Sequence, residues 1–297
     1  MIPIDKMELR QLRYFLRSAE LLNFTEAAHA LYISQSTLSQ QIKQLEDELG
    51  LLLFDRIGKR VQLTEAGKNF FDFAQQSVQH AELGRQVMQD LKGVRTGKLN
   101  IGVTYGLSTL LTSTIVAFSQ KHPDIHINVD FGSSEDLLEQ LKLGKLDFIL
   151  SFLQITANNQ FELQPLFESS MRLIAHPNHP ISKKKKISIK ELKNVPLVMP
   201  TKGFNTRYLF DKVFEKYKVK PIVKIELNDI NTLLQLVETG NWCTILTIAS
   251  VKDRRTLKTI PIAEIDIVRK ASIIWPKERY RKTAALAFTE MIQHLVL

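Results

Sequence analysis

Apolar and polar positions alternate in three different ways along the 297-residue chain. Between residues 7 and 64, apolar side chains recur at helical spacings within short segments, which predicts a small domain of short helices. Between residues 65 and 92 they recur near the spacing of a coiled coil, which predicts one long helix. From residue 98 onward, short apolar runs alternate with amphipathic segments, which is typical of alternating strands and helices in an α/β fold.

The segment from Phe24 to Leu49 predicts two helices joined by a tight break at Ile33-Ser34. Thr25 is the expected N-cap of the first helix and Ser34 that of the second, because each carries a hydroxyl that can accept from a free backbone N–H. The second helix has one apolar stripe at spacings of 4, 3 and 4, formed by Leu38, Ile42, Leu45 and Leu49. We therefore expect a helix-turn-helix motif over about residues 24–43.

The opposite face of the second helix carries hydroxyl and amide side chains and a single cation, Lys43. A solvated surface helix would more often carry pairs of Glu and Lys. Hydroxyls and amides near a helix N-terminus are the groups that read base edges in the major groove of DNA. The residues expected to contact DNA from the two helices are Thr25, Ser34, Gln35, Ser36, Thr37, Ser39, Gln40 and Lys43. On this segment alone, an ordinary helical hairpin with a polar face is the alternative.

After Gly50, which is expected to end the second helix, the chain predicts a two-stranded wing. The strands are expected at residues 53–56 and 60–63, around a turn at 57–59. Cations at such a tip can reach phosphate or the minor groove, although a solvated hairpin tip is the alternative. The wing residues expected to contact DNA are Arg56, Lys59 and Arg60.

The pattern AA-x-x-L-x-x-SQ-x-x-LS-x-x-I-x-x-LE-x-x-LG-x-x-LF-x-R, which starts at Ala27, resembles the winged helix-turn-helix of the LysR-type transcriptional regulators. The match runs without gaps from Met7 to about Gly67, and the remaining chain has the length and order of that family's effector-binding half. The resemblance implies a winged helix-turn-helix DNA-binding domain over residues 7–64. Members commonly have Pro at position 36 and Arg at position 40, whereas this chain has Ser36 and Gln40, so one charge-assisted contact is missing.

Residues 65–92 would form a helix about 42 Å long at ~1.5 Å per residue, with Thr64 as its N-cap. In the family this segment is the linker helix that pairs with its copy in a second chain. The resemblance therefore implies a homodimer whose recognition helices lie ~34 Å apart on an inverted repeat of double-stranded DNA. It further implies a homotetramer formed through the effector-binding halves, with RNA polymerase as a candidate partner. Residues 93–97, GVRTG, have the composition of a hinge.

The β-α-β-α-β order of elements over residues 98–152 predicts a parallel sheet with right-handed crossovers. The first unit is expected to have strands at 98–104, 125–131 and 146–152 and helices at 109–121 and 135–143. The second is expected to have strands at 171–176, 196–199, 222–227 and 242–248 and helices at 205–217 and 230–239. A strand at 270–276 and a helix at 279–297 are expected to return to the first unit.

By resemblance these units are the two subdomains that LysR-type regulators share with periplasmic binding proteins. Subdomain I would span about 98–167 plus 268–297, and subdomain II about 168–267, so that the effector-binding domain covers 98–297. At GNWCTILT (240–247) the chain departs from the family, which usually has a second Gly and a closing Leu-Pro there. Pocket contacts of relatives therefore do not transfer directly to this stretch.

Ligands of open α/β sheets bind in the crevice beyond the carboxyl ends of the strands. Helix N-termini ringed by hydroxyls suit a carboxylate or another anion there, to which Lys202 or Arg207 could add charge. We expect a small-molecule effector to contact Thr104, Tyr105, Ser108, Thr109, Ser133, Ser134, Ser151, Thr201, Lys202, Phe204, Asn205, Asn228 and Thr247. For residues such as Ser133 and Ser134, a purely structural role as N-caps is the alternative.

The sequence gives no support for an enzyme. It contains no G-x-G-x-x-G, Walker loop, H-E-x-x-H or G-x-S-x-G motif. The pairs His122/His126 and His176/His179 lack accompanying Cys or carboxylate at zinc spacing, so we expect neither a metal site nor a cofactor. Cys243 lies in an apolar strand and is expected to be a core residue rather than a thiol sensor. A solute-binding protein is the other alternative, which the DNA-reading helix opposes.

Charge and targeting signals complete this picture. The net charge of +9 lies in residues 181–220, which hold twelve Lys or Arg and three Asp or Glu, whereas residues 1–64 hold eight of each. The Lys run at 183–186 is expected to be a solvated loop rather than a functional patch. The N-terminus has no apolar stretch typical of a signal peptide, and no window of ~18 apolar residues is present, so we expect a cytoplasmic protein.

Overall fold

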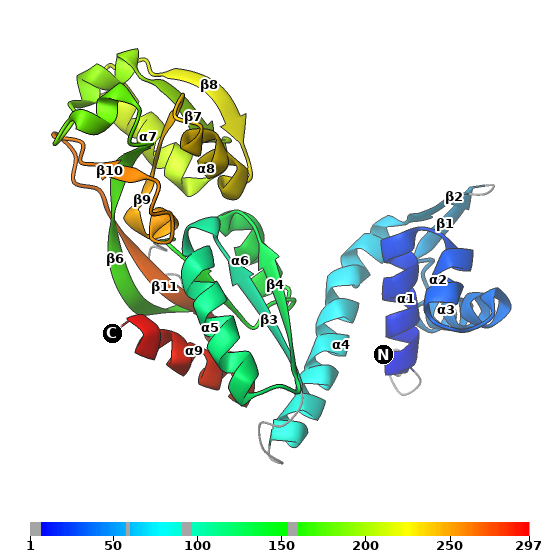
Figure 1. Ribbon diagram of the computed structural model, residues 1–297. Coiled ribbons are helices and arrows are strands. Elements are labelled where there is room, and N and C mark those ends of the chain that lie inside the picture. Colours follow the sequence, from blue (N-terminus) through cyan, green and yellow to red (C-terminus); the bar gives the residue numbers. More distant parts are fainter. Residues whose placement is uncertain (1–6, 58–59, 91–96, 154–159, 297) are drawn as a thin grey trace. The chain divides into compact units, whose positions relative to one another are not determined.

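The computed structural model describes residues 7–57, 60–90, 97–153 and 160–296 (Figure 1). The chain divides into two compact units, unit 1 within residues 1–91 and unit 2 within residues 92–297. Each unit has its own hydrophobic core. The hinge expected at residues 93–97 lies, except for Gly97, outside the described residues.

Unit 1 contains helices, a short wing and a long helix. In chain order these are α1 (Leu9–Leu21), α2 (Phe24–Ala30), α3 (Gln35–Leu49), β1 (Phe54–Ile57), β2 (Arg60–Leu63) and α4 (Glu65–Asp90). The first wing strand lies one residue further along than predicted, because Ile57 pairs with Arg60 and so belongs to β1. The long helix has 26 described residues, in keeping with the sequence pattern.

The core of unit 1 is built around Phe15, which is fully buried. Its ring centroid lies 5.5 Å from that of Phe54 at the start of the wing and 5.4 Å from that of Phe70 on α4. The predicted apolar stripe of α3 is buried against the same core, with Leu38, Ile42 and Leu45 fully covered and Leu49 at its edge. Burial of these side chains fixes which face of α3 remains in contact with solvent.

The caps of α2 and α3 differ in part from the prediction. Asn23, not Thr25, caps α2: its Oδ1 accepts from the N–H groups of Thr25 at 3.0 Å and Glu26 at 3.2 Å. This is because α2 begins at Phe24, which places Thr25 inside the first turn. Ser34 caps α3 as predicted, since its Oγ accepts from the N–H of Thr37 at 3.1 Å.

A buried carboxylate ties the end of α3 to the wing. Glu46 Oε1 accepts from the N–H of Leu53 at 2.8 Å and of Phe54 at 3.1 Å, and only 6% of the residue is exposed. Burying an ionised carboxylate is costly unless hydrogen bonds replace its hydration, and these two N–H groups do so. The position of β1 relative to the recognition helix therefore depends on Glu46.

Unit 2 contains two subdomains, each with its own part of a mixed sheet (Figure 1). The first part holds β3 (Gly97–Val103), η1 (Tyr105–Leu107), α5 (Ser108–Lys121), β4 (Ile125–Phe131), α6 (Ser134–Lys142) and β5 (Phe148–Ser151). Strand β3 pairs in parallel with both β4 and β5, as the order of elements predicts.

The second part begins with two short 3-10 helices and ends with an additional edge strand. It holds η2 (Pro180–Lys183), η3 (Ile189–Asn194), β7 (Pro196–Pro200), α7 (Asn205–Lys216), β8 (Ile222–Leu227), α8 (Ile230–Glu238), β9 (Cys243–Thr247), η4 (Ile248–Val251) and β10 (Lys258–Ile260). Strand β10 was not predicted, and it pairs with β6.

Two long strands, β6 (Phe161–Ala175) and β11 (Val268–Pro276), connect the two parts. The sequence predicted only the end of β6, at residues 171–176, because the alternation that begins at residues 161–164 is interrupted by Pro165. Antiparallel pairing with β11 holds this stretch extended. The final helix, α9 (Thr283–Val296), begins four residues later than predicted.

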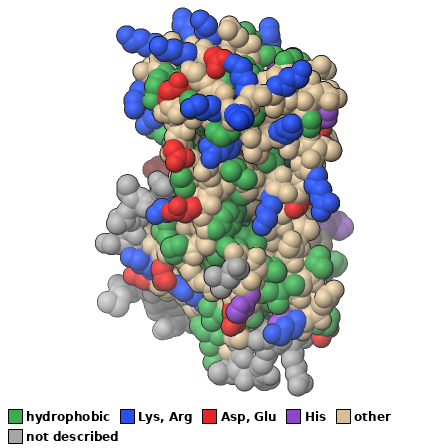
Figure 2. Space-filling view, turned by 60° about the vertical axis from the view of Figure 1, so that its left-hand side comes forward, with side chains coloured by type: hydrophobic (Ala, Val, Ile, Leu, Met, Phe, Trp, Pro, Cys, Tyr) green, Lys and Arg blue, Asp and Glu red, His purple; other side chains and the backbone are tan. Residues whose placement is uncertain are grey.

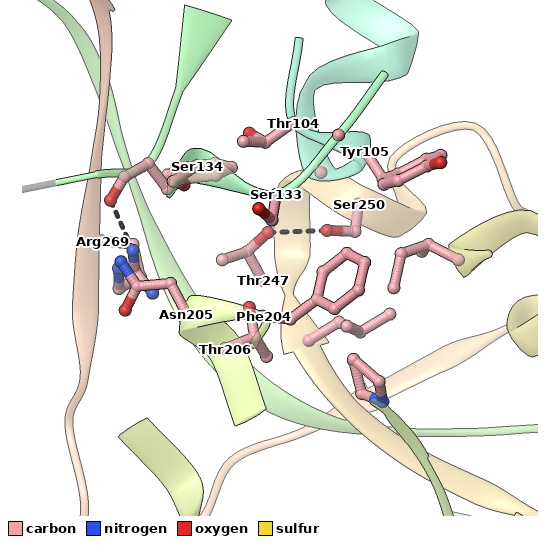
Figure 3. Close-up of a pocket in the computed structure, with 16 residues that line it drawn as sticks. Thr104, Tyr105, Ser133, Ser134, Phe204, Asn205, Thr206, Thr247, Ser250 and Arg269 are labelled. Atoms are coloured by element: carbon pink, nitrogen blue, oxygen red, sulfur yellow. Dashed lines mark hydrogen bonds between the residues drawn. The ribbon is translucent and has the colours of Figure 1, made fainter. Parts of the chain in front are cut away.

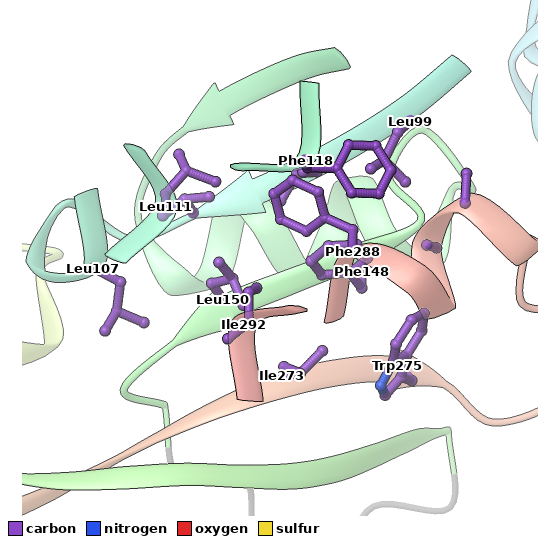
Figure 4. Packing of buried hydrophobic residues seen from close by; sticks show 14 of the residues in the cluster. Leu99, Leu107, Leu111, Phe118, Phe148, Leu150, Ile273, Trp275, Phe288 and Ile292 are labelled. Atoms are coloured by element: carbon purple, nitrogen blue, oxygen red, sulfur yellow. The ribbon is translucent and has the colours of Figure 1, made fainter. Parts of the chain in front are cut away.

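Each subdomain has its own core and its own tryptophan. In subdomain I, Phe118, Phe148, Phe288 and Trp275 pack between the sheet and the helices α5 and α9 (Figure 4). The ring centroids of Phe148 and Trp275 are 5.1 Å apart, and Trp275 is 1% exposed. In subdomain II, Trp242 is half-buried against the cluster that includes the apolar face of α8.

We expect Glu46→Ala to destabilise the junction of α3 and β1 by about 3 kcal/mol, because two buried N–H groups would lose a charged acceptor. Hydrogen–deuterium exchange of peptides covering α3 and β1 should then be roughly a hundredfold faster. Asp47→Ala, at the exposed neighbouring position, is the matched control. Equal exchange rates in the two variants would contradict a structural role for the buried carboxylate.

Candidate functional site

The first candidate site is the solvent face of α2 and α3. Of the eight residues predicted to contact DNA from these helices, Ser39 is half-buried and the others are exposed. No hydrogen bond of the Gln35, Gln40 or Lys43 side chain is found within the described residues, so these three groups are available to a ligand. Lys43 and Gln40 lie on the same helix face because they are three residues apart.

Hydroxyls at the start of α3 are partly engaged with one another. Ser34 Oγ lies 2.9 Å from Ser36 Oγ and 2.8 Å from Thr37 Oγ1, in addition to its capping bond. These contacts orient the hydroxyls at the N-terminus of the recognition helix, where the helix dipole favours an anion such as phosphate. Ser34 therefore has a structural role as N-cap, and its contact with DNA stays a prediction.

Tyr32, in the turn before α3, was not singled out from the sequence. It is 96% exposed and has a left-handed backbone with φ of 56°. A large aromatic residue in that conformation is uncommon, and exposure to this degree leaves its ring free for a partner. The signal available in the sequence was an aromatic residue directly beside the break of the helix-turn-helix.

The three cations of the wing lie at or beyond the edge of a stretch that the structure describes. Arg56 belongs to β1 and Arg60 to β2, but the placement of their side chains lies outside the described structure. Lys59 lies outside the described residues altogether. For these three residues, contact with DNA stays a prediction.

The second candidate site is a cavity of about 50 Å³ in unit 2, where loops of both subdomains meet (Figure 3). It is lined by hydroxyls, small residues and apolar rings, with a single charged residue. The lining residues are Thr104, Tyr105, Gly106, Gly132, Ser133, Ser134, Phe152, Pro200, Phe204, Asn205, Thr206, Ile230, Leu246, Thr247, Ser250 and Arg269.

Two helices present their N-termini to this cavity. Helix α6 is capped by Ser133, whose Oγ accepts from the N–H of Asp136 at 3.1 Å. Helix α7 has no side-chain cap: Phe204 stands at its N-cap position and Asn205 and Thr206 in its first turn. An uncapped first turn leaves backbone N–H groups and the positive end of the helix dipole facing the cavity, which favours an anion.

The single charged residue among those that line the cavity is Arg269. It is 4% exposed, and its Nη2 donates to the carbonyl oxygen of Phe152. No Asp or Glu occurs among the sixteen lining residues, and the described structure shows no ion pair of Arg269. Burial lowers the pKa of the guanidinium from its ordinary value, but an arginine stays protonated at neutral pH. A buried cation without an acidic partner is costly, so the cavity is chemically suited to bind an anion.

Comparison with known proteins shows to which family the chain belongs. A model described as the LysR substrate binding domain matches residues 92–296, and one described as a bacterial regulatory helix-turn-helix protein, lysR family, matches residues 9–68. The chain belongs to the LysR family. The resemblance seen in the sequence is thereby confirmed, and the protein is a DNA-binding transcriptional regulator rather than an enzyme.

Relatives and solved structures agree with this assignment. The transcriptional dual regulator GltC of Bacillus subtilis is 30% identical over 290 residues, 96% of either chain. The transcriptional activator CmpR of Synechocystis sp. is 30% identical over 261 residues, which are 87% of this chain and 84% of CmpR. The fold is similar to that of full-length CbnR complexed with its target DNA, with a TM-score of 0.70 at 22% identity over 97% of this chain and 99% of CbnR.

Within this LysR regulator, the cavity brings together about half of the residues expected from sequence. Seven of them line it: Thr104, Tyr105, Ser133, Ser134, Phe204, Asn205 and Thr247. Ser151 lies behind it, fully buried, with its Oγ 3.1 Å from that of Ser134. Ser108 and Thr109 line a neighbouring pocket of about 430 Å³ instead. Thr201, Lys202 and Asn228 are not among the residues that line the cavity.

The sequence offered Lys202 or Arg207 as a source of positive charge, and neither lines the cavity. The Arg207 guanidinium donates to Asp211 at 2.8 Å, to Glu226 at 2.7 Å and to the carbonyl of Pro200 at 3.2 Å. It therefore holds α7 against the edge of the sheet. Arg269 escaped notice because it begins β11, a strand that returns from distant sequence and whose start was predicted only at residue 270.

Two further lining residues, Ser250 and Gly106, were not among the residues expected to contact the effector. Ser250 lies in the 3-10 helix η4 after β9, and its Oγ is 2.8 Å from Thr247 Oγ1 (Figure 3). Gly106 approaches the ring of Phe152 so closely that a Cβ there would lie 3.1 Å from it. Only the strand-to-helix position of Gly106 could have indicated such an approach.

Metal and thiol chemistry receive no support from the described residues. Within them no group of three or more His, Cys, Asp or Glu is arranged to hold a metal ion. None of the described helices combines the length and apolarity needed to cross a membrane. Cys243 is fully buried in β9, and burial raises the pKa of its thiol to about 12.

We expect Cys243 to be unreactive in the native protein. With a pKa of about 12, about one thiol in ten thousand is ionised at pH 8, and the thiolate is the reactive form. Ellman's reagent should label the native chain only at the rate at which subdomain II opens, and should label it fully in urea. Rapid labelling of the native protein at pH 8 would contradict the core assignment.

Proposed function

We propose that this regulator binds a small anion, such as a carboxylate, in the cavity between its two subdomains, and that binding alters its hold on an inverted-repeat promoter site. The observation that carries the proposal is Arg269, a buried guanidinium that faces the cavity without an acidic partner. A bound anion would supply the missing charge, and the uncapped first turn of α7 would donate backbone N–H groups to it.

The size of the cavity limits the part of the effector that enters it. At about 50 Å³, compared with ~30 Å³ for one water molecule in the liquid, it has room for a group as small as a carboxylate. A larger effector would extend past Tyr105 and Ser250, which also line the adjoining pocket of about 430 Å³. The proposed headgroup site is therefore the end near Arg269.

Ligand binding at this place would be coupled to the arrangement of the subdomains. Thr104 and Ser134 belong to subdomain I, Asn205 and Thr247 to subdomain II, and Arg269 to the strand that connects them. A ligand held by all of them binds better when the subdomains are closed, and so shifts the population toward that state. Through the contacts between chains in the proposed oligomer, closure of the subdomains would alter how the protein contacts its promoter site.

The remaining parts of the proposal concern assembly. We propose division into residues 7–64 for DNA binding, 65–92 for dimerisation and 98–297 for effector binding. Members of the family oligomerise, and we propose a homodimer through α4 that forms a homotetramer through the effector-binding domains. In this arrangement the protein acts in the cytoplasm, at promoters, with RNA polymerase as its partner. The length of α4 and the family membership support this view.

We expect Arg269→Gln to abolish stabilisation by small anions. Thermal unfolding of the full chain would be followed with formate, acetate, sulfate, phosphate and larger carboxylates. An anion at a hundredfold excess over its dissociation constant stabilises the wild type by ~2.7 kcal/mol, and the variant should show no shift. Without anion, the variant should unfold at the same temperature as the wild type or higher, because an unpaired buried charge is removed.

Lys202→Gln is the matched control for this experiment, because Lys202 is an exposed cation nearby that does not line the cavity. It should respond to anions like the wild type. A stabilising anion that acts equally on Arg269→Gln would show that the binding site lies elsewhere.

We expect Gln40→Ala combined with Lys43→Ala to abolish specific promoter binding while leaving a folded dimer. Both side chains are exposed on α3 and have no partner within the described residues, so their removal should not destabilise unit 1. Electrophoretic mobility shift on the protein's own promoter region, with analytical ultracentrifugation for the dimer, measures both outcomes. Glu26→Ala on α2 is an exposed control. Wild-type affinity in the double variant would refute the assignment of this face.

A further inference from the structure

Neither the DNA-reading face nor the cavity uses the lysine-rich surface of subdomain II. Residues 181–220 have an excess of nine positive charges, which equals the net charge of the whole chain. Residues 1–64, which contain the helix-turn-helix, are balanced at eight basic and eight acidic residues. The net positive charge of this regulator thus belongs to the part that binds the effector, not to the part that reads bases.

Two acidic groups near this surface are engaged in holding the backbone, whereas Glu215, beside Lys216, is exposed. Glu191 pairs with Lys184, and its other carboxylate oxygen accepts from the N–H of Ser188 at 2.9 Å. Glu264 accepts from Ser188 Oγ at 2.6 Å and from the N–H of Ile189 at 2.8 Å. These hydrogen bonds, with a smaller contribution from the charge of Lys190, lower the pKa of Glu264, and its oxygens bind groups at the start of η3.

Glu264 also brings two lysine-bearing segments together. Its carboxylate holds Ser188 and Ile189, whereas its backbone oxygen accepts from Tyr217 Oη at 3.2 Å. Lysines flank both attachment points. We name the resulting group the lysine surface and define it as Lys185, Lys186, Lys190, Lys193, Lys216 and Lys218.

All six members of the lysine surface are exposed, and none of them has an ion pair within the described part of the chain. Figure 2 shows Lys and Arg side chains gathered over the end of unit 2 that carries α7 and β8, with few acidic side chains among them. Like charges held this close repel one another, and the repulsion is relieved when a polyanion binds. The surface is therefore chemically matched to a row of phosphates.

We propose that the lysine surface binds the phosphate backbone of double-stranded DNA outside the base pairs read by α3. The chain belongs to a family that binds DNA through its helix-turn-helix, so duplex DNA is a polyanion that this regulator meets in its function. Lysine ammonium groups on flexible stems neutralise phosphates without reading sequence. An acidic protein partner fits less well, because protein interfaces are depleted in lysine.

The test measures the salt dependence of binding by the full chain to a random-sequence duplex of about 60 base pairs, at about 50 to 200 mM salt. The variant carries Lys186→Gln, Lys190→Gln and Lys193→Gln. Each phosphate contact contributes about −0.9 to the slope of log affinity against log salt, so the slope should become shallower by about two to three. Affinity at the low-salt end should fall by about tenfold or more.

A control with Lys121→Gln, Lys145→Gln and Lys277→Gln removes the same charge from exposed positions of subdomain I. Its slope should remain that of the wild type. Equal slopes for the two triple variants would overturn the proposal and point to an acidic protein as the partner of this surface. The combined Gln40 and Lys43 variant should keep the contribution of the lysine surface on random DNA, which separates this proposal from the assignment of α3.

Discussion

The pairing of β6 with β11 is the constraint on which unit 2 depends. The two strands are antiparallel from Val268 opposite Ser170 to Pro276 opposite Phe161. In addition, β11 pairs with β5 of subdomain I and β6 with β9 of subdomain II, so the ribbon fixes both halves of the sheet. Side chains alternate along a strand, and a slip of one residue would turn Arg269 to the opposite face. The chemistry of the cavity is thus set by strand register.

Three buried ionic side chains show how the same physical cost leads to different roles. Glu46 is satisfied by two backbone N–H groups, and Arg207 by two carboxylates and a carbonyl. Both are structural, because their hydrogen-bonding capacity is used within the fold. Arg269 has one carbonyl and an otherwise open face toward a polar cavity. The difference lies in the partners, since all three are similarly buried.

Patterns between neighbours in sequence predicted most helices and strands of this fold. They did not predict which side chains from distant segments come into contact. The stripe of α3, the cap at Ser34 and the order of strands and helices in unit 2 depend on neighbours in sequence, and the structure bears them out. The cap at Asn23 was missed by two residues, which is within the usual uncertainty of a helix start.

The sequence predicted which loops line the candidate cavity, but not which residue brings a positive charge to it. Thr104, Ser133 and Asn205 belong to segments that lead from a strand into a helix, so the rule for open α/β sheets finds them. Arg269 is more than a hundred residues from the carbonyl of Phe152 to which it donates, and only the return of β11 brings the two together. Conversely, Arg207 has the right sequence position but pairs with Asp211, four residues further along the same helix, and with Glu226 of β8, which only the fold brings near.

The two tryptophans lie in different halves of unit 2, in different environments. Trp275 is sealed in the core of subdomain I, where its Nε1 donates to Gln164 at 2.9 Å and Arg281 lies over its ring, whereas Trp242 is half-buried in subdomain II. The chain has two tryptophans in all, and both are in unit 2. Its tryptophan emission therefore reports on unit 2 alone, with one indole in each half, whereas unit 1 contributes tyrosine emission from Tyr14 and Tyr32.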